Sequence, residues 1–268
     1  MDFHGIHLPD RDEIKTPGKK LSAGEHANVY EWGKEYVIKL FSSAYSIDDI
    51  NREYYNALAV KNLPFRKAEV VELKKTEFGF GIVFKKIEGE NLLSYIERTG
   101  DYEFAAEQMC ILQKSIGACK MKTENVSSIE SVRQQLRREM LSTSKADTDA
   151  TKEMIRFLGT MKDGDSLCHG NLHPDNIMIT DDGPVAVGFS HYSIGDAIYD
   201  TAKCFFNIAY TPLPGEQSKG CSCNVPGCRG IADSEERKKL ARLYLNGMGT
   251  SAVEIGCYLS MVIAGFER

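Results

Sequence analysis

The sequence predicts an α+β protein with two lobes, a small β-rich lobe followed by a larger helical lobe. Short runs rich in Val, Ile, Tyr and Phe, broken by glycines, fill the first third of the chain. Helical periodicity dominates from Leu92 onward, and the polar stretch Glu88–Asn91 separates the two patterns. Strands followed by helices are typical of an α+β arrangement. We therefore expect lobes over residues 1–87 and 88–268, joined near Lys85–Glu90.

The strand signals of the first lobe surround one helix signal. Strands are expected over 19–21, 28–32, 36–41, 68–73 and 79–86. A helix is expected from Ser46, because Ser46 and Asp49 match a capping pattern and apolar residues follow at helical spacing. The first lobe is thus expected to be a sheet with a single helix.

The second lobe reads as helices around one short strand–loop–strand block at 167–189. Helices are expected over 128–142, 149–161, 194–209, 234–246 and 251–265. The first of these is expected to begin at Ser127, because Glu130 follows three residues later as in a capping box.

Composition excludes several classes of protein. The chain has 268 residues, of which 42% are hydrophobic and 26% charged, so wholesale disorder is excluded. A formal net charge of −5 is unfavourable for sequence-independent nucleic-acid binding. The apolar run 255–265 is too short to span a membrane, and the first residues lack the pattern of a signal peptide. We expect a cytoplasmic protein without membrane or nucleic-acid partners.

The most informative stretch, residues 167–205, reads LCHGNLHPDNIMITDDGPVAVGFSHYSIGDAIYDTAKCF. It resembles the catalytic core of the aminoglycoside phosphotransferase and choline-kinase-like family, a branch of the protein-kinase-like fold. The segments LSAGEHANVYEWG (21–33), VIKLF (37–41) and GIVFKKIEGENLL (81–93) resemble the family's phosphate-covering hairpin, lysine strand and crossover. The resemblance implies a two-lobed kinase-like fold and ATP-dependent, magnesium-dependent transfer of phosphate to a hydroxyl group of a small molecule.

The resemblance also implies a nucleotide site in the first lobe. Lys39 is then expected to reach the α- and β-phosphates, with Glu53 holding its ammonium group. Gly24 is expected to let the backbone approach the phosphates. Outside this context, Lys39 and Glu53 would be read as surface residues and Gly24 as an ordinary hairpin glycine.

In the second lobe, the resemblance assigns roles around the segment that begins at His169. His169 and His173 are expected to be structural and to bond loop backbone. Asn176 fills the position of a metal-binding asparagine, although an asparagine can also cap the loop. Asp196, the first acid of the G-D-x-x-x-D segment that ends at Asp200, is expected to brace the catalytic loop, or to cap the following helix.

Two departures from the family pattern bear on function. The family's catalytic loop reads H-G-D, whereas Asn171 stands here at the position of the aspartate. An amide can orient a hydroxyl group but cannot take its proton, and loss of a general base costs ~10²–10⁴ in rate. Gly188 stands where the family has the aspartate that binds magnesium, and glycine offers no ligand. Together these changes favour a pseudokinase that binds nucleotide and has a doubtful magnesium site.

Two alternatives stay open. Asp175, Asp181 or Asp182 could supply a compensating carboxylate, which would leave an active phosphotransferase acting on a small-molecule hydroxyl. Asp181 and Asp182 also read as a solvated turn, and Asp175 as a solvent-facing residue. A module that binds a protein or other partner without nucleotide is the second alternative.

A cysteine-rich loop lies outside the family pattern. Cys221, Cys223 and Cys228 stand close together between glycines and a proline. Thiolates so placed can bind zinc, but the spacing differs from paired C-x₂-C knuckles and no fourth ligand is near. A flexible loop with reduced thiols is the alternative.

Overall fold

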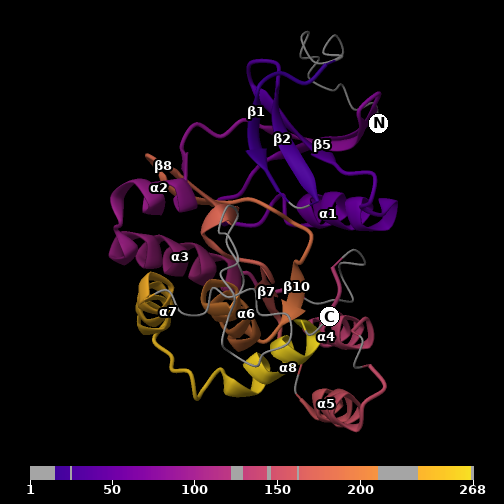
Figure 1. The fold of residues 1–268 in the computed structure, drawn as a ribbon, viewed down its shortest axis with the longest axis vertical. Helices are drawn as coiled ribbons and strands as arrows, with labels where there is room; N and C mark the ends of the chain where they lie inside the picture. Colours follow the sequence, from indigo (N-terminus) through magenta and orange to yellow (C-terminus); the bar gives the residue numbers. More distant parts are fainter. Residues whose placement is uncertain are drawn as a thin grey trace. The chain divides into compact units, whose positions relative to one another are not determined.

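The computed structural model confirms the mixed α+β architecture (Figure 1). It describes residues 16–24, 26–121, 129–143, 146–161, 163–210 and 235–266. The chain divides into two compact units, the first made of Met1–Lys61 and Ala68–Glu88, the second of Asn62–Lys67 and Gly89–Arg268. The short insert Asn62–Lys67 belongs to the second unit because the amide of Ala186 donates to the carbonyl of Arg66 at 3.0 Å. No helix among the described residues is long and apolar enough to cross a membrane.

The first unit is built on an antiparallel five-stranded sheet with the order β1-β2-β3-β5-β4. Its strands are β1 (Lys20–Ala23), β2 (Ala27–Trp32), β3 (Tyr36–Phe41), β4 (Val70–Thr76) and β5 (Gly79–Lys85). Side chains alternate between two faces along a strand, and one face buries a cluster. This cluster contains Trp32, Tyr36, Ile38, Leu40 and Val83. Lys39, between two of these buried positions, therefore points to the opposite face.

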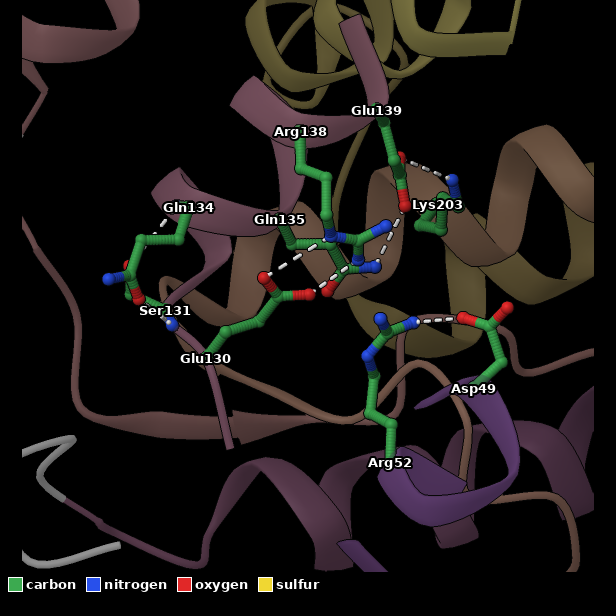
Figure 2. Close-up of polar contacts among 9 residues, drawn as sticks. All are labelled: Asp49, Arg52, Glu130, Ser131, Gln134, Gln135, Arg138, Glu139 and Lys203. Atoms are coloured by element: carbon green, nitrogen blue, oxygen red, sulfur yellow. Dashed lines mark hydrogen bonds and ion pairs between the residues drawn. The ribbon is translucent and has the colours of Figure 1, made fainter. Parts of the chain in front are cut away.

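The helix α1 (Ile47–Ala59) follows the sheet's third strand and begins where the sequence predicts. The side chain of Ser46 accepts a hydrogen bond from the amide of Asp49, which satisfies one of the free amides of the first turn. Arg52 pairs with Asp49 within the same turn (Figure 2). The inward side of α1 carries an acid, Glu53, which is only 1% exposed.

The second unit is mainly helical. Its helices are α2 (Leu92–Thr99), α3 (Tyr102–Gly117), α4 (Val132–Leu141), α5 (Asp149–Thr160), α6 (Ala197–Tyr210), α7 (Glu235–Met248) and α8 (Gly256–Phe266). Its strands are β6 (Glu90–Asn91), β7 (Ser166–Cys168), β8 (Ile177–Thr180), β9 (Gly183–Ala186) and β10 (Ser193–Gly195). They form two small sheets, β6-β8-β9 and β10-β7. The helix α6 packs against α7, α8 and β7, so it lies at the centre of this unit (Figure 1).

The helix α4 begins later than the sequence predicts. Its cap is Ser131, whose side chain accepts from the amide of Gln134 while Gln134 accepts from the amide of Ser131 (Figure 2). Ser127 lies outside the described residues. Glu130, which directly precedes the cap residue, is not a capping-box partner but forms an ion pair with Arg138 (Figure 2). The pairs Ser127 with Glu130 and Ser131 with Gln134 both match the capping-box pattern, so the sequence alone does not indicate which serine caps the helix.

An ion pair with little solvent access connects α4 to α6. Lys203 lies 3.2 Å from one carboxylate oxygen of Glu139, and Gln135 donates to the other at 3.0 Å (Figure 2). Burial opposes ionisation of Glu139, but Lys203 and Gln135 outweigh it and lower the pKa of the carboxyl. The pair therefore holds a charged Glu139 against the helix that carries the site described next.

Candidate active site

One candidate site, within the first unit, is an ion pair. The ammonium nitrogen of Lys39 on β3 lies 2.6 and 2.8 Å from the two carboxylate oxygens of Glu53 on α1. Glu53 is buried, whereas the lysine side chain keeps 26% of its surface exposed. This geometry fixes the position of an accessible cation, which is what a phosphate-binding lysine requires.

Gly24 lies in the turn between β1 and β2. Its amide donates to the carbonyl of Ala27 at 2.9 Å, and a β-carbon on it would lie 3.0 Å from the same oxygen. The turn is therefore tight enough to favour glycine for reasons of packing alone. Residue 25, at the tip, lies outside the described residues, and the approach of Gly24 to phosphates stays a prediction.

A second candidate site, within the second unit, is the loop that leads from β7 into β8. It begins at His169 and ends in a short 3₁₀ turn, Pro174–Asn176. Gly170 adopts a positive φ of 73°, and a β-carbon on it would lie 2.2 Å from the carbonyl oxygen of His191. Glycine is thus required at this position by both conformation and space.

Asp200 on α6, and not Asp196, holds the backbone of this loop. Its two carboxylate oxygens accept hydrogen bonds from the amides of His169 and Gly170, at 3.0 and 2.8 Å. Burial raises the pKa of Asp200 to about 6, against the lowering effect of these two amides and of Gln113. Asp196 instead accepts from the amide of Ile198 at 2.9 Å and so caps α6. The bracing role implied for Asp196 by the family resemblance is therefore corrected, and the helix-cap alternative describes its contacts.

The histidines of the loop bond to neighbouring backbone or side-chain amides. Nε2 of His169 lies 3.3 Å from the carbonyl of Val187, and its Nδ1 accepts from the amide of Asn171 at 3.3 Å. Burial, followed by the effect of His173, lowers the pKa of His169 to about 3. Burial, followed by His191, lowers the pKa of His173 to about 4. Both rings are neutral near pH 7, and the contacts of His169 are those of a structural residue.

A residue on α6 forms a hydrogen bond with the side chain of Asn171. Its Oδ1 accepts a hydrogen bond of 3.0 Å from Nδ2 of Asn207, a residue that sequence reasoning did not single out. The carbonyl of Asn207 accepts in turn from the guanidinium group of Arg237 on α7, at 3.0 Å. Asn207 and Arg237 are both buried. No short motif marks either residue, because each lies on a helix far from the loop in sequence.

Asn176 and Gly188 face each other across the loop. Nδ2 of Asn176 donates to the carbonyl of Asn171 at 2.8 Å, which leaves its Oδ1 turned toward Gly188. A β-carbon on Gly188 would lie 3.2 Å from that oxygen. A side chain at position 188 would therefore lie beside the Asn176 oxygen, but glycine provides none.

The family's magnesium site does not fit the described residues. Magnesium binds through one or two carboxylates together with phosphate oxygens, and position 188 supplies no side chain. Within the described ranges, no group of three or more His, Cys, Asp and Glu side chains is placed to hold a metal ion. Asn176 alone is left of the expected ligands.

Two of the proposed compensating acids lie at the far end of a strand. Asp181 and Asp182 form the exposed turn after β8, and Asp182 lies 3.5 Å from Arg66. β8 places about 16 Å of extended chain between Asn176 and this turn. Compensation by Asp181 or Asp182 is therefore ruled out by distance. Asp175, beside Asn176, is partly buried rather than solvent-facing, and burial raises the pKa of its carboxyl.

The cysteine-rich loop with Cys221, Cys223 and Cys228 lies outside the described residues. Four of the remaining cysteines are buried free thiols, namely Cys110, Cys119, Cys168 and Cys204, and Cys257 is exposed.

Comparisons with family models and with solved structures identify the family and the fold of the chain. The model of the phosphotransferase enzyme family matches residues 18–220. No curated protein matches the chain.

Solved structures show the same fold at low sequence identity. A streptomycin–ATP complex of the aminoglycoside phosphotransferase APH(2″)-IIa has a TM-score of 0.53 and 17% identity, over 92% of this chain and 83% of that one. APH(3″)-Id from Streptomyces rimosus, in complex with ADP and streptomycin, has a TM-score of 0.55 and 12% identity, over 97% of each chain. A choline/ethanolamine kinase family protein from Mesorhizobium loti has a TM-score of 0.52 and 13% identity, over 96% of this chain and 80% of that one.

Proposed function

Because the chain belongs to the phosphotransferase enzyme family, we propose that it is a catalytically impaired member, a pseudokinase that binds nucleotide and transfers phosphate poorly or not at all. The observation that carries the proposal is the pair of positions Asn171 and Gly188, at which the loop is intact but the two reactive carboxylates are absent. A role in binding or regulation follows, with a small-molecule hydroxyl compound or a protein as partner. A cytoplasmic location remains a prediction from the sequence.

Nucleotide binding is supported by the Lys39–Glu53 pair. A lysine held by a buried carboxylate presents its positive charge at a fixed place, and phosphoryl-transfer proteins use such a cation to bind the α- and β-phosphates. Structures of similar fold were solved with ATP and ADP. We propose ATP as the nucleotide here.

The residues at positions 171 and 188 both support impaired catalysis, because each one affects a different requirement of phosphoryl transfer. Proton removal from an acceptor hydroxyl needs a base, and the amide of Asn171 is not basic. Neutralisation of charge that develops on the phosphate oxygens needs a metal or cation, and Gly188 removes the carboxylate that would help to hold the metal. Neither the neutral His169 nor the distant acids at 181 and 182 replace these groups.

The test is ATP binding measured by calorimetry, in magnesium and then in EDTA. We expect equal affinity in both conditions and loss of binding in Lys39→Met. Binding that disappears in EDTA would contradict the proposal and favour an active enzyme in which Asp175 helps to hold the metal. Absence of binding in both conditions would favour a module that does not use nucleotide.

A reversal experiment tests the cause of impairment. Asn171→Asp combined with Gly188→Asp should give magnesium-dependent ATP hydrolysis that the natural chain lacks. Asn246→Asp combined with Gly249→Asp is a matched control, because Asn246 is exposed and Gly249 has a similar positive φ of 74°. No gain of hydrolysis in a folded first variant would mean that the impairment has another origin.

A further inference from the structure

One face of α6 controls both the backbone and the side chain of the catalytic loop. Asp200 and Asn207 are seven residues apart, which is about two helical turns, so both lie on the same side of the helix. Asp200 holds the amides of His169 and Gly170, and Asn207 holds the side chain of Asn171. The orientation of Asn171 is therefore set by the scaffold.

This contact uses the oxygen of the Asn171 amide. Oδ1 of Asn171 accepts from Asn207, and Nδ2 on the same carbon carries two hydrogens that can be donated to another group. Among the described residues, none accepts a hydrogen bond from this nitrogen. Asn171 is also partly exposed, whereas Asn207 behind it is buried.

We infer that Asn207 is a positioning residue that turns position 171 into a hydrogen-bond donor for a phosphate oxygen. In the family this position carries a carboxylate, which accepts a proton and repels a phosphate group. Here the amide nitrogen can only donate, and a donor that meets an ionised oxygen forms a stronger hydrogen bond than one that meets a neutral oxygen.

The contacts of Asn207 extend the scaffold behind Asn171 to α7. Arg237 is a buried cation in contact with the carbonyl of Asn207. Asp200 is enclosed by the two loop amides it accepts from, whereas Asp175 is part of the loop and partly exposed. The inference shares one assumption with the proposed function, namely that a phosphorylated ligand binds at this loop. This ligand is a nucleotide or a phosphate monoester.

The experiment is NMR of the ¹⁵N-labelled full chain, in which the side-chain amide signal of Asn171 is assigned as the pair of peaks missing from Asn171→Asp. ATP in EDTA and phenyl phosphate are added separately. We expect at least one of them to shift this signal, and the one that does identifies the nucleotide or the monoester as the source of the phosphate. We also expect Asn171→Asp to bind that ligand about tenfold more weakly in EDTA.

A second variant tests the positioning role itself. Asn207→Asp can only accept, so Asn171 must then donate to it and present its oxygen outward. We expect the phosphate-dependent shift to disappear in this variant and to persist in Asn246→Asp, which makes the same charge change on the surface of α7. If Asn207→Asp fails to fold, the shift of the Asn171 amide signal in the natural chain still shows whether a phosphate group binds there.

The outcomes separate this inference from the proposed function. Calorimetric binding of ATP with no shift of the Asn171 signal by either ligand would overturn the inference and leave the proposed function standing. A shift caused by phenyl phosphate without ATP binding would support the inference and contradict the proposed function. An unchanged shift in a folded Asn207→Asp would refute the positioning role.

Discussion

The side-chain oxygen of Asn176 lies 3.2 Å from the point that a β-carbon on Gly188 would occupy. The backbone at Gly188 has a φ of 80°, in the left-handed region that aspartate tolerates better than most residues. A side chain at position 188 would therefore stand directly beside the Asn176 oxygen, which would have to shift by a few tenths of an ångström to admit it.

Gly188→Asp is expected to create magnesium dependence. The new carboxylate would face Asn176 and complete a pair of oxygen ligands, at a cost of about 1 kcal/mol for a side chain at positive φ. Magnesium should then raise the thermal midpoint of the ATP-bound variant but not of the natural chain. Gly188→Ala carries similar strain without a ligand and should not respond. An equal response of both variants to magnesium would show that position 188 is not the cause.

Lys39→Met is expected to weaken both ATP binding and the fold. It leaves the buried carboxylate of Glu53 without its partner, and a buried polar group left without its partner costs about 1–3 kcal/mol. ATP affinity should fall at least tenfold. Lys74→Met is the control, since Lys74 has a similar exposure of 24% in the same sheet and a longer ion pair of 3.7 Å. A comparable loss of ATP affinity in Lys74→Met would argue against a specific role for Lys39.

The fold and part of the site were predictable because they depend on local patterns. The Lys39 strand, the Ser46 cap of α1 and the H-G-N segment that begins at His169 each leave a signature within a few residues. Asn207 and Arg237 leave none, because their roles arise from packing of α6 and α7 around a loop more than 30 residues away from either.

The two aspartates of α6 illustrate a different limit. Asp196 and Asp200 are four residues apart, and the sequence does not indicate which one caps α6 and which one lies within the helix. The structure places Asp196 at the cap, where its side chain bonds the first turn, and Asp200 one turn later against β7. Similarly, Asp181 and Asp182 are near Asn176 in sequence but are separated from it by the length of β8, because an extended strand moves residues apart quickly.

The stability of the protein is expected to fall with acid, in part through His169. Its pKa is about 3 in the folded state and about 6.5 when unfolded, so its contribution is fully present above pH 6.5 and is lost as pH falls toward 3. Between pH 6.5 and 4 this amounts to roughly 3 kcal/mol at 1.36 kcal/mol per unit. Urea unfolding at several pH values should show a shallower slope in His169→Asn than in the natural chain. Parallel slopes would mean that His169 titrates normally in the folded protein.

The buried pair of Glu139 and Lys203 should behave as a coupled unit. Glu139→Gln leaves a cation that is only 12% exposed without its counter-charge, and the expected loss is about 3 kcal/mol. Lys203→Met alone leaves the carboxylate unpaired and should cost a similar amount. The double variant removes both charges, so it should be less destabilised than the sum of the single variants by about 1–3 kcal/mol. Additive losses in urea unfolding would show that the two side chains do not stabilise each other. Because the pair ties α4 to the helix that carries Asp200 and Asn207, the single variants should also broaden the Asn171 amide signal.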